Sequence, residues 1–301
     1  MLLKGEAMPA GMTLHLRQNN FCGSDPGAVR LVVCDLDSAL LNSRKLISQA
    51  NLKAIKAVRS RGIFVTVCTG RIPRMMEVYS RIMEIRGCFV AANGAIVVDT
   101  RNGGMPYAEY LNPKDAGRFL EFCRQEGFDH VAAAVEGCYY VRGSERIKKF
   151  EQYNETARME GLRQIQLRQF DSAYDAVKNM RIYKILVSGL SEDQMRKAEE
   201  FIRGLSFSYC TSSEPGLLDI SAFGVDKGKG VQILAGIMGY EKEEICVIGD
   251  CRSDLPMFDA AGFSIAMGSA DDEIKSRASV VTGANDEDGV AMALEKFFLG
   301  S

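Results

Sequence analysis

Two acidic residues stand one residue apart at the end of an apolar segment near the N-terminus. Arg30 is followed by Leu-Val-Val-Cys and then by Asp35, Leu36 and Asp37. Open α/β sheets bind ligands at the carboxyl edge of their strands, where a buried parallel strand would deliver both carboxylates. One carboxylate could attack an electrophile or hold a metal ion while the other transfers a proton. Such pairs also occur in ordinary strand caps and turns, so this pair alone does not identify a site.

Three other segments could complete the same site. Thr69-Gly70 follows a second apolar segment and opens a helix, where a hydroxyl group beside free backbone N–H groups suits a phosphate. Lys227 begins another helix, where the helix dipole disfavours a cation and therefore suggests a nearby anion. Asp250 and Asp254 follow a third apolar segment and form a second pair of acids. Each feature alone could be a helix cap or a surface lysine, but their repeated position after strands favours one shared pocket.

The elements that would position these residues alternate between strands and helices near both ends of the chain. This order predicts an α/β fold with a doubly wound parallel sheet. The strands are expected at 31–36, 63–68, 88–92, 95–99, 244–248, 263–266 and 279–282, and the helices at 48–60, 73–85, 227–238 and 287–298. A strand at 217–221 is expected to resume this pattern after the middle of the chain.

The middle of the chain departs from the alternating pattern. Helices at 112–125 and 192–203 and strands at 138–141 and 182–188 indicate an α+β module inserted into the sheet domain. The expected domains are therefore a core of residues 30–104 and 213–301, an inserted α+β domain of residues 105–212, and a poorly ordered N-terminal extension of residues 1–29.

Composition excludes several classes of function. A formal net charge of -2 in 301 residues gives no reason to expect nucleic acid or an anionic membrane as a partner. No apolar run approaches the ~18–20 residues that cross a bilayer, and we expect no secretion signal. Nine cysteines without a Cys-x-x-Cys pair argue against a zinc site or a disulfide framework and favour the reducing cytoplasm. Because His15 and His130 are the only histidines, a hard cation with oxygen ligands is the metal site that remains open.

The ordered motifs resemble the haloacid dehalogenase superfamily of phosphatases, and within it the Cof-type branch, which carries a large α+β cap. The resemblance covers residues 31–298. It rests on Asp-Leu-Asp at 35–37, Thr-Gly-Arg at 69–71, Ala-Asn-Gly-Ala at 92–95, Lys-Gly at 227–228, Gly-Asp-x-x-x-Asp at 249–254 and Ala-Met-Gly at 266–268. It implies hydrolysis of small phosphorylated metabolites, such as sugar phosphates or phosphorylated cofactors.

The same resemblance implies a role for each site residue. Asp35 would attack the substrate phosphorus and become a transient aspartyl phosphate, and Asp37 would protonate the leaving alcohol and then activate water. Mg²⁺ would be held by the Asp35 carboxylate, the Asp37 backbone carbonyl and Asp250, with Asp254 supporting or ligating, a donor set that suits this ion. The substrate-binding positions would be Leu36, Thr69, Gly70, Arg71, Asn93, Lys227 and Ser253.

Two departures from the family's pattern leave alternatives open. Ser38-Ala39 stands where Gly-Thr is usual, which removes a hydroxyl group and would strain Ser38 if that position has positive φ. Ser253 stands where asparagine is usual, with fewer hydrogen-bond donors. A working phosphatase is the favoured function. A catalytically weakened phospho-ligand-binding protein and a phosphomutase with a similar cap are the alternatives, while the inserted cap argues against a phospho-acceptor receiver domain.

Overall fold

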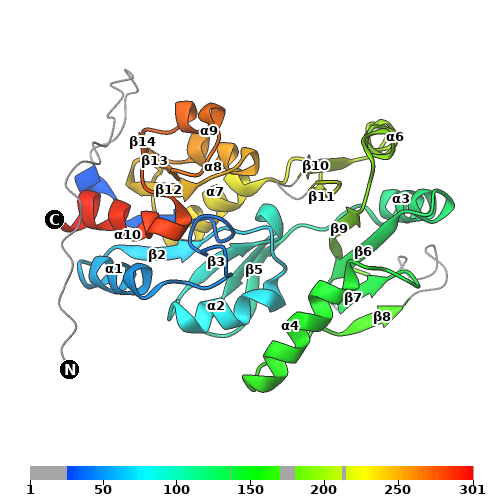
Figure 1. The fold of residues 1–301 in the computed structure, drawn as a ribbon, viewed down its shortest axis with the longest axis horizontal. Helices are drawn as coiled ribbons and strands as arrows, with labels where there is room; N and C mark the ends of the chain where they lie inside the picture. Colours follow the sequence, from blue (N-terminus) through cyan, green and yellow to red (C-terminus); the bar gives the residue numbers. More distant parts are fainter. Residues whose placement is uncertain (1–25, 136, 170–179, 212–214, 301) are drawn as a thin grey trace, which may run out of the picture.

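The computed structural model describes residues 26–135, 137–169, 180–211 and 215–300. Two lobes lie side by side in Figure 1. The first and last described elements belong to one lobe, and the middle of the chain forms the other (Figure 1). Of the N-terminal extension expected at 1–29, residues 1–25 lie outside the described residues, and Pro26–Ala28 forms a short 3-10 turn before the first strand.

The core lobe is built on a five-stranded parallel sheet with the order β14-β13-β12-β1-β2. Its strands are β1 (Leu31–Cys34), β2 (Phe64–Val67), β12 (Ile245–Gly249), β13 (Phe263–Ala266) and β14 (Val280–Val281). The interior strand β1 is buried along its whole length between β12 and β2. This position explains its uninterrupted apolar run, because helices cover both faces of a parallel sheet. The prediction of an α/β fold with a doubly wound parallel sheet is confirmed.

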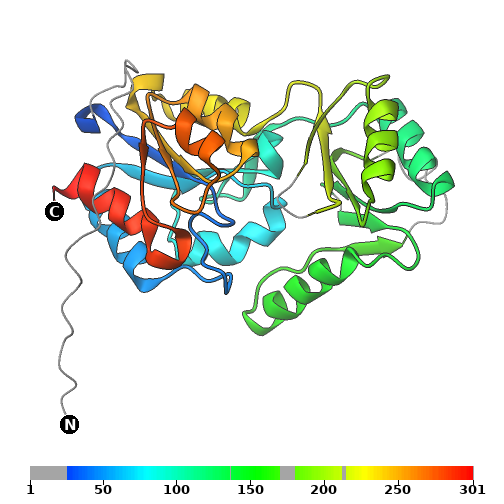
Figure 2. The same ribbon diagram turned by 45° about the horizontal axis from the view of Figure 1, so that its top comes forward.

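Helices pack on both faces of this sheet (Figures 1 and 2). One apolar cluster joins the sheet to α1, α2 and α10, and a second joins it to α7, α8 and α9. The bounds are α1 (Gln49–Ser60), α2 (Met76–Ile82), α7 (Lys227–Met238), α8 (Leu255–Ala260), α9 (Asp272–Arg277) and α10 (Gly289–Leu294). Ser48 caps α1 and Asp226 caps α7 through side-chain hydrogen bonds, so both helices begin close to the expected positions.

A small antiparallel sheet extends the core beside β2. It contains β3 (Cys88–Ala91), β4 (Ile96–Asp99) and β5 (Gly104–Ala108). A single bridge between Cys68 and Val90 joins β3 to the end of β2. The β3–β4 connection is a tight turn in which Ala92, Asn93 and Gly94 all have positive φ. This turn brings Asn93 to the same sheet edge as the end of β2.

The second lobe, which we call the cap, is a six-stranded sheet with the order β10-β11-β9-β6-β7-β8. Its strands are β6 (Asp129–Ala134), β7 (Gly137–Tyr140), β8 (Leu167–Gln169), β9 (Ile182–Ser188), β10 (Phe207–Thr211) and β11 (Leu218–Ala222). One apolar cluster joins the sheet to α3 (Pro113–Gln125) and α6 (Glu192–Ile202), and a second joins it to α4 (Ile147–Met159). The cap is thus an α+β unit, as the motif pattern indicated.

The strand expected at 217–221 forms, but the prediction that it resumes the parallel sheet is wrong. β11 pairs antiparallel with β10 and β9 of the cap. All five residues of β11 are buried, so its sequence resembles that of a strand in the parallel sheet. Leu218 and Ile220 instead contribute to the apolar core of the cap. Conversely, β5 pairs with β4 of the core, so the chain enters the cap after residue 108. Outside the elements that the sequence pattern predicts lie β5, β6, β8, β10, α4 and α8.

The described cysteines are not paired with one another. Seven described cysteines are free thiols, and all but Cys251 are buried. The six buried cysteines are small apolar components of the packing. Across the described residues, no helix combines the length and apolar character that a membrane span requires.

We expect Gly94→Ala to lower the free energy of unfolding by more than about 2 kcal/mol. Gly94 has a φ of 99°, and a Cβ atom there would lie 1.9 Å from the Asp226 carbonyl oxygen. Gly62→Ala is the matched control, since Gly62 has a φ of 84° but open space around it. Urea denaturation should show a clearly smaller loss for the control. Equal losses would mean that the contact with α7 does not require glycine.

Candidate active site

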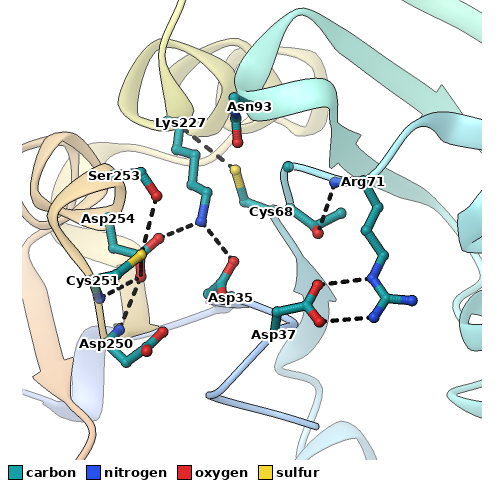
Figure 3. A network of polar contacts seen from close by, with 12 residues as sticks. Asp35, Asp37, Cys68, Arg71, Asn93, Lys227, Asp250, Cys251, Ser253 and Asp254 are labelled. Carbon is teal, nitrogen blue, oxygen red and sulfur yellow. Dashed lines mark hydrogen bonds and ion pairs between the residues drawn. The ribbon is translucent and has the colours of Figure 1, made fainter. Parts of the chain in front are cut away.

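The residues singled out in the sequence meet at the carboxyl edge of the core sheet (Figure 3). They come from the segments after β1, β2, β3 and β12 and from the first turn of α7. The residues that Figure 3 labels among them are Asp35, Asp37, Arg71, Asn93, Lys227, Asp250, Ser253 and Asp254. Leu36 differs from these residues because its side chain is fully buried in the apolar cluster beneath the sheet edge. Only the Leu36 backbone could therefore touch a ligand.

Three buried charges form the centre of this arrangement. The Lys227 ammonium lies 2.7 Å from Asp35 Oδ1 and 2.5 Å from Asp254 Oδ1. The three side chains are 4%, 5% and 0% exposed, respectively. Because buried charges are costly unless paired, loss of the ammonium would leave two uncompensated carboxylates, whereas loss of one carboxylate would leave Lys227 paired with the other. Lys227 thus connects the end of β1 with the loop after β12.

The electrostatics of this centre favour a second cation. Burial, together with the charges of Asp254 and Asp250, raises the pKa of Asp35 well above its ordinary value despite the opposing charge of Lys227. Burial alone would lower the pKa of Lys227, but Asp254 and Asp35 raise it well above its ordinary value. Burial and the neighbouring Asp254 raise the pKa of Asp250 to about 7. Three carboxylates therefore share one buried ammonium, which leaves excess negative charge.

Asp250 and Asp254 have different surroundings. Asp254 Oδ2 accepts hydrogen bonds from the backbone N–H groups of Asp250 and Cys251, at 2.9 and 3.1 Å, while Oδ1 faces Lys227. Asp250 Oδ1 is buried and has no hydrogen-bond partner among the described residues. A free buried carboxylate oxygen fits a hard divalent cation. Asp250 is therefore suited to be the ligand, and Asp254 to hold the loop and Lys227.

Cys251 completes the cluster of possible ligands with Asp250 and Asp254, whose ligand atoms lie within 4.8 Å of one another. Burial raises the pKa of the Cys251 thiol, which disfavours the thiolate that a metal would need. Its Sγ lies 3.1 Å from Ser253 Oγ and 3.3 Å from Asp254 Oδ2. The oxygen ligands are thus the better donors here.

The side chains of Arg71 and Lys45 hold the Asp37 carboxylate, which lies outside the buried group of Asp35, Lys227 and Asp254. Arg71 donates two hydrogen bonds to its carboxylate, at 2.8 and 2.7 Å, and Lys45 donates a third at 3.0 Å. The Arg71 guanidinium also lies over the Tyr79 ring, 4.8 Å from its centroid. Burial would raise the pKa of Asp37, but the hydrogen bonds and charge of Arg71 hold it well below the usual range. Asp37 is therefore an ionised carboxylate in this arrangement.

Thr69 and Gly70 lie beside Asn93, but they do not open a helix as expected. The next turn begins at Pro73, so the polarity of a helix N-terminus does not act at Thr69. Thr69 is buried, and its Oγ1 accepts a hydrogen bond from the Arg71 N–H at 3.2 Å. A Cβ atom on Gly70 would lie 2.7 Å from Asn93 Oδ1, so glycine permits this close approach.

Sequence reasoning missed three charged residues near the site. Lys45 pairs with Asp37 from the loop after β1 and belongs to no recognisable motif. Lys184 of β9 and Asp219 of β11 form a buried ion pair with a separation of 2.6 Å. Asp219 also accepts a hydrogen bond from Asn93, and Lys184 donates one to the Gly70 carbonyl. A charged residue in the middle of an apolar strand was the available signal for the last two.

A cavity of about 590 Å³ lies apart from these residues, between the core and the cap. It is lined by α2, by the β4–β5 region and by the β6–β7 hairpin. Asp35, Asp37 and Lys227 do not line it, so its volume says nothing about the carboxylate cluster.

Comparisons with known proteins give a consistent result. A family model described as haloacid dehalogenase-like hydrolase matches residues 32–294. The chain is 31% identical over 292 residues to the 5-amino-6-(5-phospho-D-ribitylamino)uracil phosphatase YwtE of Bacillus subtilis, which covers 90% of this chain and 99% of that protein. A second phosphatase of B. subtilis named for the same compound, YcsE, is 25% identical, with 90% and 96% covered. A solved haloacid dehalogenase-like hydrolase from Bacteroides thetaiotaomicron has a TM-score of 0.77 at 25% identity and covers 90% of this chain and 100% of its own.

We expect Ser38→Gly to raise the free energy of unfolding by about 0.5–1 kcal/mol, because Ser38 has a φ of 61° and glycine adopts this region without strain. The positive φ confirms the condition under which the sequence predicted strain at this position. Ser43→Gly is the matched control, since Ser43 does not have positive φ and glycine there adds only chain entropy to the unfolded state. Thermal denaturation that ranks both variants below the parent protein would contradict the argument.

Proposed function

The chain belongs to the haloacid dehalogenase-like hydrolases, and we propose that it is a Mg²⁺-dependent phosphatase that forms an aspartyl phosphate on Asp35. Membership of the family, in its Cof-type branch, confirms the resemblance seen in the ordered motifs. The observation that carries the proposal is the buried group in which Lys227 bridges Asp35 and Asp254, beside the free oxygen of Asp250. Phosphoryl transfer requires this combination of a positioned nucleophile and charge stabilisation.

In the proposed first step, the Asp35 carboxylate at the end of β1 bonds to the substrate phosphorus while the bond from phosphorus to the alcohol oxygen breaks, and Asp37 gives that oxygen its proton. Lys227, the Thr69 hydroxyl group and the Gly70 N–H would bind the phosphoryl oxygens, and Arg71, Asn93 and Ser253 would line the pocket around the substrate. Lys227 is suited to its role because its position beside Asp35 is fixed by Asp254. In-line attack then depends mainly on positioning and electrostatic stabilisation, which rigid buried groups supply.

The residues fit a Mg²⁺ ion. The Asp35 carboxylate, the Asp37 backbone carbonyl and Asp250 would hold it, and Asp254 would support the loop, since both of its oxygens already accept hydrogen bonds. When bound, Mg²⁺ would neutralise charge on the phosphoryl oxygens. The excess buried negative charge around Asp250 is the feature of this chain that favours the ion.

Asp37 would serve as acid and then as base. Its ionised state beside Arg71 suits the second step, in which Asp37 takes a proton from the water that attacks the phosphorus, breaks its bond to Asp35 and releases inorganic phosphate. The first step needs a proton on Asp37, so we propose that Arg71 leaves this carboxylate for the substrate when the phosphoester binds. Arg71 would then act both as a substrate contact and as a group that sets the protonation of Asp37.

The proposed substrates are small phosphorylated metabolites, and we propose neither nucleic acid nor membrane as a partner. Two relatives are named for 5-amino-6-(5-phospho-D-ribitylamino)uracil, so this compound belongs first in a substrate panel with sugar phosphates and phosphorylated cofactors. We propose a cytoplasmic location, in keeping with the free thiols. We also propose a core of residues 30–108 and 223–301 and a cap of residues 109–222, which adjusts the expected boundaries to the strand pairing.

We expect the purified protein to hydrolyse a chromogenic aryl phosphate with Mg²⁺ and to lose this activity with a chelator. Asp35→Asn should lower kcat by a factor of about 10³ or more without unfolding the protein, because it removes the nucleophile. Asp272→Asn, at an exposed position of α9, is the matched control and should retain activity. Turnover by neither the parent protein nor the control, together with retained binding of sugar phosphates, would favour the weakened phospho-ligand-binding protein that Ser38-Ala39 and Ser253 suggested.

We expect Mg²⁺ to stabilise the protein more at pH 8 than at pH 6. The pKa of Asp250 is raised to about 7 without a metal, so protons compete with the ion below this pH. The same shift destabilises the metal-free protein as pH rises from the ordinary carboxyl pKa towards 7, because the folded state binds more protons than the unfolded state over this range. The rise in Tm on adding Mg²⁺ at each pH is the measurement. Asp250→Asn should abolish the rise, and a rise that is equal at both pH values would contradict this assignment.

A further inference from the structure

A buried ion pair of the cap lies directly against the candidate phosphate pocket of the core. The Lys184 ammonium is 2.6 Å from Asp219 Oδ2, and the two side chains are 4% and 10% exposed. The residues come from adjacent antiparallel strands, β9 and β11. Apolar residues of similar size often stabilise a fold as well as a buried ion pair does. The stability of the cap therefore does not by itself explain why a charged pair is buried here. The other contacts of Lys184 and Asp219 offer an explanation.

Those contacts cross from the cap to the core. Lys184 Nζ also donates a hydrogen bond to the carbonyl oxygen of Gly70. Asp219 Oδ2 accepts a second hydrogen bond, of 2.9 Å, from the Asn93 side-chain amide. Asn93 Oδ1 in turn lies so close to Gly70 that a Cβ atom there would be only 2.7 Å away. Two charged cap residues thus hold the two core segments that follow β2 and β3.

The hydrogen bond to Gly70 has a consequence for Thr69. The Gly70 carbonyl and the Arg71 N–H belong to one planar peptide group, so fixing one fixes the direction of the other. The Arg71 N–H donates to Thr69 Oγ1 at 3.2 Å. A hydroxyl group has one proton and two lone pairs, and this contact uses a lone pair. The Thr69 proton therefore stays available for another acceptor.

We propose that Lys184, held by Asp219, is a positioning residue of the cap that orients the Thr69 hydroxyl group and Asn93 towards the phosphate group of the substrate. The phosphate pocket is then complete only when the cap is docked on the core. This inference rests on the proposed phosphatase function. Binding of inorganic phosphate tests it separately, since binding requires no turnover.

The test is a double-mutant cycle between Lys184 and Thr69. Lys184→Met should raise the dissociation constant of inorganic phosphate, measured by calorimetry with Mg²⁺ present, by about tenfold, as expected for one charge-assisted hydrogen bond. Thr69→Val should weaken binding by a similar factor. The double variant should be little worse than either single variant, because both changes act through the same hydroxyl group. In steady-state assays with an aryl phosphate, Lys184→Met should raise KM and the inhibition constant of phosphate together.

The chain supplies a matched control and a conservative variant. Lys197 pairs with Glu126 at the same separation of 2.6 Å, but at the exposed surface of the cap, so Lys197→Met should leave phosphate binding unchanged. Lys184→Arg should restore part of the binding, because it retains the charge. If Lys184→Met does not fold, Lys184→Met/Asp219→Leu removes both buried charges and should show the same tenfold weakening.

Two results would overturn the proposal. One is a lower Tm for Lys184→Met with an unchanged dissociation constant for phosphate. The other is a full multiplication of the two single effects in the double variant, which would mean that Lys184 does not act through Thr69. Absence of turnover in the parent protein would instead count against the phosphatase function, while the phosphate-binding cycle would still decide the role of Lys184.

Discussion

The ion group of Asp35, Lys227 and Asp254 is the interaction on which the rest of the site depends. Its members are fully or almost fully buried, so each carboxylate requires the Lys227 ammonium as its partner (Figure 3). They come from the end of β1, from the start of α7 and from the loop after β12, so the group fixes three segments that are distant in sequence. The parallel order β12-β1-β2 makes this possible, because neighbouring strands end at the same edge.

The position of Lys227 in this ion group also links the site in the core to the cap. β11 returns the chain from the cap, and α7 begins at Lys227 only a few residues later. Gly94 of the β3–β4 turn packs against the backbone of Asp226, and Asn93 beside it bonds to Asp219 of the cap. The ammonium at the centre of the site and the cap contact at its edge therefore share one short stretch of chain. A displacement of the cap would therefore act on both Asp219 and Lys227.

The sequence predicted the parts of the site whose positions follow from local rules. Asp35, Thr69 and Asp250 each follow an apolar strand, and parallel strands bring such ends together, so their convergence could be expected. The sheet that contains β11 could not be expected, because a buried strand of five residues looks the same in either lobe. The pairing of Lys184 with Asp219 depends on the register between β9 and β11, which no local pattern encodes. The face of α4 with Ile147, Phe150, Tyr153 and Ala157 carries a helical period, so this helix does follow from a local rule.

The surroundings of Asp37 bear on its proposed role as acid and base. A single carboxylate cannot be both a strong acid–base group and a permanently paired anion, because Arg71 and Lys45 stabilise only its ionised form. Asp37 is the more exposed of the two acids after β1, and its partners are the exposed Lys45 and the largely buried Arg71, which Tyr79 also holds. Asp35 has the opposite surroundings, since Lys227 and Asp254 leave it little freedom. The division is physically sensible for phosphoryl transfer, in which the nucleophile must be held still while the acid–base group changes its protonation between steps.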